Sequence, residues 1–219
     1  MTYDFDTPID RSGTYSLKWE EAGDALPMWV ADMEFQTAPQ IRVALQQRLD
    51  HGIFGYSIVP PEWNQAYVNW WRRRHNLDID PESLVFCTGV VPAISSMVRK
   101  LTTANENVLI QTPVYNIFFN SIINNGCRVL ESPLEYDGSG HYSINWADLE
   151  SKLADPQTTL MILCNPHNPV GRIWDRDTLA HIGELCWNNH VTVISDEIHC
   201  DLTDPGYDYV LVSVNERCA

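Results

Sequence analysis

Short runs of consecutive apolar residues alternate with amphipathic segments over the second half of the chain. We predict strands over the runs at residues 84–88, 107–110, 127–131, 159–164 and 191–195. Apolar residues recur at helical spacing in the segments between them, which predicts helices over 91–102, 114–124, 146–154 and 177–189. Continuously apolar strands that alternate with helices are typical of a mostly parallel sheet covered on both faces. We therefore expect an α/β fold.

The first part of the chain has a different pattern. Residues 1 to about 36 show little periodicity, and we interpret them as an arm. A helix is expected from about Thr37 to a stop at Gly52, and a second helix after Pro60-Pro61. The segment 135–142 predicts a tight turn between two short arms. We assign residues 1–50 to an arm with part of a small domain and residues 51–219 to a large domain.

Charge and cysteine usage narrow the class of protein. The chain carries 14 Lys plus Arg against 29 Asp plus Glu, a net charge of -15, which disfavours nucleic acid and anionic lipid as partners. Its six cysteines occur singly, without a C-x-x-C pair, as expected for thiols in a reducing compartment. The N-terminus lacks an apolar signal region, and no run reaches the roughly 18 apolar residues of a membrane span. We expect a cytoplasmic protein.

Polar and aromatic side chains that could bind a ligand follow several of the predicted strands. In open α/β sheets, ligands bind beyond the carboxyl ends of the strands. Asp196 ends one apolar strand, and Asn168 follows the strand before it in the sequence. Tyr115 follows another strand, where a flat ring could lie parallel to a heteroaromatic cofactor. The backbone N–H groups of Thr88-Gly89-Val90-Val91, at a strand-to-helix turn, could hold a phosphate.

Each of these residues also has an ordinary structural interpretation. Asn168 could cap a turn, Tyr115 could be a half-buried tyrosine, and a Thr-Gly turn alone is weak evidence for an anion site. A metal site is a further alternative, because several possible ligands follow one another: Asp196, Glu197, His199 and Asp201. No H-E-x-x-H pattern or cysteine pair supports a metal, and no G-x-S-x-G elbow supports a serine hydrolase. We therefore predict no metal.

Taken together, the motifs resemble one family. The chain resembles the fold-type I pyridoxal phosphate enzymes of aminotransferase class I and II, in particular their cystathionine β-lyase and bacterial carbon-sulfur lyase branch. The most specific motifs are Asn165-Pro166-His167-Asn168-Pro169-Val170-Gly171 and Ser195-Asp196-Glu197-Ile198-His199. Supporting motifs are Met28 to Phe35, Phe54-Gly55-Tyr56-Ser57, Thr88 to Val91 and Thr112 to Tyr115. The tryptophan in the arm motif favours the lyase branch.

The resemblance implies pyridoxal 5'-phosphate as cofactor and a role for each matched position. Tyr115 would stack on the ring, Asn168 would bond the ring hydroxyl, and Asp196 would pair with the pyridinium nitrogen, which keeps the ring an electron sink. His199 occupies the place of a tyrosine that many transaminases carry. Phosphate contacts would come from Gly89, Val90 and Val91, and from Tyr56 toward the partner subunit of a homodimer. The substrate carboxylate would be bordered by Trp29, Val30 and Ala31.

One expected group is missing. The Schiff-base lysine of the family lies some thirty residues beyond the aspartate, whereas the only lysines here are Lys18, Lys100 and Lys152. No catalytic residue is therefore assigned, and we expect a chain truncated before that lysine, without appreciable lyase activity. Because the strand at residues 84–88 would lack its neighbours in the sheet, we also expect a poorly soluble or marginally folded chain.

The implied reaction is α,β-elimination of cystathionine or a related cysteine thioether to pyruvate, ammonia and a thiol. A base would remove the Cα proton into the electron sink of the ring, and the β-thiolate would depart. Two alternatives stay open. The pocket residues would also serve an aminotransferase of class I or II, and a non-catalytic binding or regulatory role is a third possibility.

Overall fold

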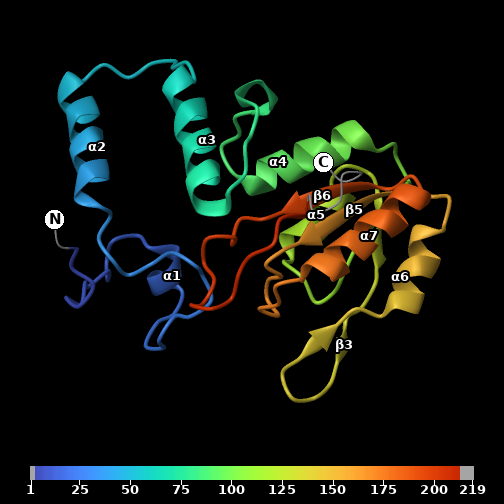
Figure 1. The fold of residues 1–219 in the computed structure, drawn as a ribbon. Helices are drawn as coiled ribbons and strands as arrows, with labels where there is room; N and C mark the ends of the chain where they lie inside the picture. Colours follow the sequence, from blue (N-terminus) through green and yellow to red (C-terminus); the bar gives the residue numbers. More distant parts are fainter. Residues whose placement is uncertain (1–2, 213–219) are drawn as a thin grey trace. The chain divides into compact units, whose positions relative to one another are not determined.

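The computed structural model describes residues 3–212, and the chain divides into two compact units, residues 1–67 and 68–219. The second unit contains a parallel sheet in the order β2-β1-β5-β6, of which β5 and β6 are labelled in Figure 1. Its strands are β1 (Asn107–Ile110), β2 (Arg128–Glu131), β5 (Thr158–Cys164) and β6 (Thr192–Asp196). These bounds confirm four of the five predicted strands to within one residue at each end. The parallel pairing confirms the predicted α/β class.

Helices cover both faces of this sheet. On one face, α4 (Val90–Leu101) and α5 (Ile117–Ile123) pack with the apolar side chains of β1, β5 and β6. On the other face, α6 (Trp146–Leu153) and α7 (Arg176–Asn188) pack on a second apolar cluster. The central β5 contributes fully buried residues to both clusters, because alternate side chains of a strand point to opposite faces.

Capping residues and turn residues explain where the elements begin and end. The carboxylate of Asp175 accepts a hydrogen bond from the backbone N–H of Thr178 at 2.8 Å and so starts α7. The predicted tight turn is a hairpin of β3 (Glu135–Tyr136) and β4 (Tyr142–Ser143). Within the turn of this hairpin, the carboxylate of Asp137 accepts hydrogen bonds from the backbone N–H groups of Ser139 and His141. The turn is thereby held by side chain as well as by backbone.

The strand predicted over residues 84–88 is wrong. A short 3-10 helix, η1 (Pro81–Ser83), is followed by extended backbone that pairs with no strand in the described part of the chain. Val85 is 82% exposed and Phe86 is 47% exposed. The segment has the apolar composition of a strand, but a strand forms only where a neighbour accepts its backbone hydrogen bonds.

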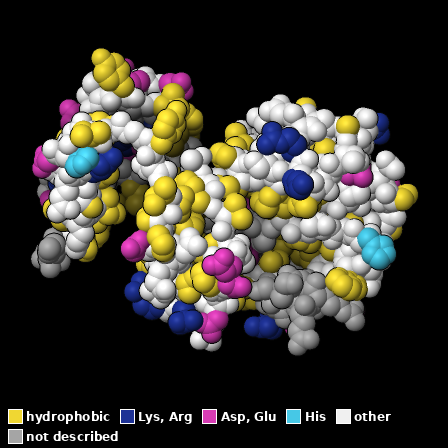
Figure 2. All heavy atoms as spheres, turned by 90° about the horizontal axis from the view of Figure 1, so that it is seen from above, with side chains coloured by type: hydrophobic (Ala, Val, Ile, Leu, Met, Phe, Trp, Pro, Cys, Tyr) yellow, Lys and Arg dark blue, Asp and Glu magenta, His cyan; other side chains and the backbone are white. Residues whose placement is uncertain are grey.

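The first unit contains α1 (Leu17–Glu20) and α2 (Pro39–His51), and α3 (Pro61–His75) begins in it and ends in the second unit. Gly52 ends α2 with a left-handed backbone, φ +72°, as the sequence predicts. None of the residues of α2 is buried. Figure 2 shows apolar side chains at the surface of both units.

A network around Glu34 organises the arm. Its carboxylate accepts hydrogen bonds from Lys18 Nζ at 2.7 Å and from Trp19 Nε1 at 3.0 Å, and Lys18 also donates to the carbonyl of Asp32. Lys18 is 8% exposed, so its charge is held inside this network. The functional boundary near residue 50 stays a prediction, whereas the two compact units meet after Tyr67. Within residues 3–212, no helix has the length and apolar character needed to cross a membrane.

Candidate functional site

The two most specific motifs lie at the ends of neighbouring strands. Cys164, the last residue of β5, is the register partner of Asp196, the last residue of β6. The backbone N–H of Asn165 donates to the carbonyl of Asp196 at 3.0 Å, which joins the start of one motif to the other. Because β5 and β6 are parallel, the Asn168 loop and Asp196 lie at the same edge of the sheet, as predicted from the sequence.

Asp196 is a buried carboxylate, and no cationic side chain of residues 3–212 pairs with it. It is 6% exposed, and its Oδ1 accepts a hydrogen bond from the backbone N–H of Ile198 at 3.1 Å. Burial raises the pKa of Asp196, and the hydrogen bond from the Ile198 N–H and the nearby His199 offset part of that rise. Among the described residues, no Lys, Arg or His nitrogen lies within 4.0 Å of its oxygens. One backbone N–H does not balance the charge of a buried carboxylate, so the site fits a positively charged ring nitrogen.

The Asn168 loop is held by its own backbone and by Asn165. Asn165 is fully buried; its amide donates to the carbonyl of Val210 at 2.9 Å and accepts from the N–H of Trp174 at 3.1 Å. The backbone N–H of Asn168 donates to the Sγ of Cys164 at 3.4 Å. The loop therefore presents the Asn168 side chain from a fixed base.

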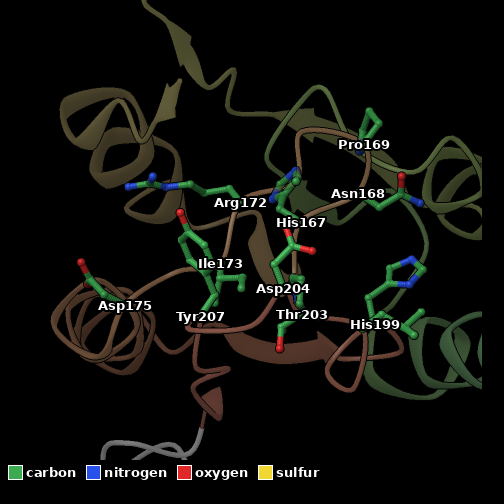
Figure 3. A pocket seen from close by; sticks show the side chains of 13 residues that line it. His167, Asn168, Pro169, Arg172, Ile173, Asp175, His199, Thr203, Asp204 and Tyr207 are labelled. Atoms are coloured by element: carbon green, nitrogen blue, oxygen red, sulfur yellow. The ribbon is translucent and has the colours of Figure 1, made fainter. Parts of the chain in front are cut away.

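A cavity of about 730 Å³ opens beside this loop (Figure 3). Asn168 and His199 both line it, from the loop after β5 and from the turn after β6. In Figure 3, these two side chains lie on one side of the view, and Arg172, Asp175 and Tyr207 lie on the other. The structure thus brings Asn168 and His199 into one cavity, and Asp196 lies at the base of the turn that carries His199.

The predicted phosphate-binding turn begins α4, but it does not follow a strand. Gly89 precedes the helix with extended backbone, φ 166°, and an added Cβ would meet only Pro92 at 3.7 Å. Glycine is therefore not required here by the local backbone. The first N–H groups of a helix lack partners within the helix, so those of Val90 and Val91 are available to an anion. Val90 packs against the same apolar cluster as Cys164.

Tyr115 lies on the same side of the sheet as these groups. It is 38% exposed, and its ring meets the buried Phe118 of α5 edge to face at 5.9 Å between centroids. Asp196 shares its strand face with Ile194, which packs in the α4 and α5 layer. Tyr115, Asp196 and the start of α4 therefore belong to one face and one edge of the sheet.

The remaining predicted site residues belong to the first unit and are described there alone. Trp29 is 58% exposed, Val30 is half-buried and Ala31 is exposed, in the segment before Asp32 of the Glu34 network. Tyr56 is fully exposed. Their roles toward a substrate or a phosphate stay predictions.

Sequence reasoning missed the residues that hold the loops. Cys164, His167 and Asn165 are 3%, 2% and 0% exposed, although two of the three are polar. Burial raises the pKa of the Cys164 thiol to about 11, so it packs as a neutral group. A polar side chain directly after a buried strand was the available signal, but its partner across the sheet edge could not be read from the sequence.

The four metal ligands considered from the sequence, Asp196, Glu197, His199 and Asp201, do not come together at one point. Within the described residues, the one group of histidine, cysteine and carboxylate side chains close enough to share an ion is His75, Cys200 and Asp201. Of the four ligands considered from the sequence, only Asp201 belongs to it. The Asp201 carboxylate accepts from Trp70 Nε1 at 2.8 Å and lies 3.0 Å from His75 Nε2, so hydrogen bonding brings Asp201 and His75 together.

Two of the lysines in the sequence belong to the second unit, and both lie elsewhere on it. Lys152 pairs with Asp148 at 2.7 Å and donates to the carbonyl of Glu131 at the end of β2, which β1 and β5 separate from β6. Lys100 lies in the last turn of α4, at the far end of that helix from Gly89. Neither amine is positioned beside Asp196.

The chain is similar in sequence to two curated bacterial proteins. The chain is 47% identical over 212 residues to cystathionine beta-lyase PatB of Bacillus subtilis (strain 168), covering 94% of this chain and 54% of that protein. It is 37% identical over 207 residues to protein MalY of Escherichia coli (strain K12), covering 91% and 53%. The chain therefore spans about half the length of the curated relatives it matches.

A solved structure shares the fold. Cystalysin from Treponema denticola, which contains a pyridoxal 5'-phosphate cofactor, superposes with a TM-score of 0.92 at 36% identity, over 100% of this chain and 57% of that one. The family model of aminotransferase class I and II matches residues 27–217, which include both strand-end motifs. With that match and the parallel sheet that carries Asn168 and Asp196, the chain belongs to the aminotransferase class I and II family.

Proposed function

We propose that this chain supplies the cofactor-holding part of a pyridoxal 5'-phosphate-dependent carbon-sulfur β-lyase of the cystathionine β-lyase type. The observation that carries the proposal is the buried Asp196 carboxylate, which has no cation within 4.0 Å among the described residues and lies at the strand edge shared with Asn168. When bound, the cofactor supplies an electron sink for the pair left at the substrate Cα.

The residues of the chain act by holding and polarising that ring. The Asp196 carboxylate keeps a proton on the ring nitrogen, because a cation beside a buried carboxylate favours the charged form of both. Asn168 donates to the ring hydroxyl from the rigid loop after β5. Tyr115 covers a ring face, and the N–H groups at the start of α4, from Gly89, Val90 and Val91, bind the phosphate. His199, which lines the cavity, would lie on the ring-hydroxyl side.

The reaction type rests on the relatives. PatB is named a cystathionine beta-lyase, so the proposed substrate is L-cystathionine or a related cysteine thioether. Trp29, Val30 and Ala31 would border the substrate carboxylate. Since Lys152 is held by Asp148 and Lys100 ends α4, the amine that bonds the cofactor is not assigned to either residue.

The finer assignments belong to the same proposal. We place Tyr56 against the phosphate of a partner subunit, which makes the working form a homodimer. A cytoplasmic location is supported by thiols in place of disulfides at Cys127, Cys164 and Cys200.

Cofactor binding is tested by titrating the chain with pyridoxal 5'-phosphate and following ring absorbance and protein fluorescence. We expect saturable binding that Asn168→Ala weakens by about tenfold and Asp196→Asn by more, because a charged partner contributes more than a neutral one. Asn188→Ala and Asp177→Asn are matched controls, since both residues are exposed on α7. Equal binding by all five proteins would refute the assignment.

The reaction is tested on the longest polypeptide that the gene encodes, with L-cystathionine and pyridoxal 5'-phosphate. Release of pyruvate and ammonia supports the β-lyase. Transfer of the amino group to a keto acid without pyruvate release would instead identify an aminotransferase. The absence of both activities in a protein that binds the cofactor would support a non-catalytic role.

A further inference from the structure

A buried histidine connects two loops at the edge of the sheet. His167 is 2% exposed, and its Nε2 lies 3.0 Å from the carbonyl oxygen of Pro113. A carbonyl only accepts hydrogen bonds, so Nε2 carries the proton and donates. Pro113 is in the loop after β1, and His167 is in the loop after β5, the strand next to β1 in the sheet. The bond therefore spans two strand ends.

On the β5 side, the histidine is rigidly joined to Asn168. The backbone N–H of His167 donates to the carbonyl of Arg172 at 2.7 Å, and the N–H of Gly171 donates to the carbonyl of His167 at 2.8 Å. Gly171 closes this turn with φ +69°. The ring of His167 also meets the buried Trp174 edge to face at 5.9 Å between centroids. The position of Asn168 thus follows that of its neighbour.

On the β1 side, the acceptor lies two residues before Tyr115. The backbone N–H of Thr112 donates to the carbonyl of Ser132 at 3.3 Å, and the N–H of Leu134 donates to the carbonyl of Thr112 at 2.7 Å, so this loop is tied to the segment after β2. The carbonyl of Tyr115 accepts from the N–H of Phe118 at 3.1 Å. Between these anchors, the Pro113 carbonyl is held by the histidine.

We propose that His167 is a positioning residue that fixes the spacing between Asn168 and Tyr115 by clamping their two loops together. The Nε2 of His167 is taken up by the Pro113 carbonyl, so the histidine would act on the ring through Asn168 and Tyr115. The importance of this spacing rests on the proposed function, because Asn168 and Tyr115 would grip one heterocycle from its hydroxyl edge and from its face. The clamp itself is a property of the chain without any ligand.

Two substitutions distinguish the hydrogen bond of His167 to Pro113 from a role of the side chain in packing alone. His167→Gln places an amide N–H near the position of Nε2 and can still donate to Pro113, whereas His167→Leu keeps an apolar side chain and removes the donor. Ile182→Val is the matched control, because it trims the core on α7, whose buried side chains pack on the face of the sheet opposite α4 and α5. Each protein is measured at the same number of degrees below its own melting temperature.

Hydrogen-deuterium exchange measures how rigidly the two loops are held, and it needs no ligand. We expect His167→Leu to raise exchange in peptides that cover both 112–118 and 165–172, and His167→Gln to leave both near the wild-type rate. Faster exchange in 165–172 alone, or equal exchange in the Leu and Gln variants, would overturn the proposal, because it would show a local packing role.

Titration with pyridoxal 5'-phosphate then measures the effect of the clamp on cofactor affinity. The dissociation constant should rise about tenfold in His167→Leu, with recovery in His167→Gln and no change in Ile182→Val. Unchanged affinity in His167→Leu, with wild-type binding intact, would overturn the positioning role. Failure of the wild-type chain to bind would instead refute the proposed function, and the exchange result would decide the clamp by itself.

Discussion

The backbone N–H of Asn165 donates to the carbonyl of Asp196 at 3.0 Å, directly after the point where Cys164 and Asp196 end neighbouring parallel strands. This bond continues the ladder by one step into the loop that carries Asn168. The side chain of Asn165 then leaves the ladder and binds Val210 and Trp174. The carboxylate and the amide proposed to hold the cofactor are therefore built on one continuous hydrogen-bonded base.

Asp196→Asn should stabilise the chain in the absence of cofactor. Burial raises the pKa of Asp196 in the folded chain, so above that pKa the folded state carries a buried charge that the unfolded state exposes to water. The advantage of the Asn variant is greatest near neutral pH and shrinks as pH falls through the folded pKa toward the unfolded value. Differential scanning calorimetry should show a melting temperature higher by about 2–4 °C per kcal/mol gained.

Added pyridoxal 5'-phosphate should reverse that order. A bound ring cation satisfies the Asp196 carboxylate, so the cofactor should raise the melting temperature of the wild-type chain more than that of Asp196→Asn. An Asn variant that is less stable than wild type without cofactor at pH 7 would show that the carboxylate is already satisfied within the protein.

Asn165→Ala should destabilise the strand edge. The residue is fully buried, and its loss leaves the N–H of Trp174 and the carbonyl of Val210 without their partner. We expect a loss of about 1–3 kcal/mol in the free energy of unfolding, measured by urea denaturation. Asn188→Ala, at an exposed position of α7, should change stability by less than about 0.5 kcal/mol.

Thiol labelling should discriminate sharply between cysteines. Burial raises the pKa of both Cys164 and Cys200 to about 11, and both are less than a tenth exposed, whereas Cys87 is exposed. With iodoacetamide at pH 8, peptide mapping should find Cys87 modified before Cys164 and Cys200, which should stay protected until urea is added. Equal rates at Cys87 and Cys164 would contradict the packing of Cys164 under the Asn168 loop.

Glu34→Gln should loosen the arm. The Lys18 ammonium beside Glu34 lowers the pKa of that carboxyl, and removal of the negative charge leaves the nearly buried lysine with weaker acceptors. Limited proteolysis should cut more rapidly after Arg11 and Lys18 in the variant. Asp24→Asn, at an exposed position of the same arm, serves as the control and should be cut at the wild-type rate.

The local elements could be read from the sequence because their signals are local. Apolar runs predict β1, β2, β5 and β6, helical spacing predicts α4 to α7, and Gly52 predicts the end of α2. Residues 84–88 carry the same apolar signal yet form no strand, because strand formation depends on a neighbour and composition says nothing about one. The motifs that contain Asn168 and Asp196 identify the family through residue types at fixed spacing.

Residue patterns alone are enough to predict the α/β class, the order of its elements and the two motifs at the ends of β5 and β6. Three relationships appear only in the folded chain: Cys164 pairs in register with Asp196, Asp196 is buried without a cationic partner among the described residues, and His167 bonds to Pro113. These relationships join residues 32 and 54 positions apart in the chain. Their burial and hydrogen bonding arise only when the sheet packs, since no local propensity specifies a partner across strand ends.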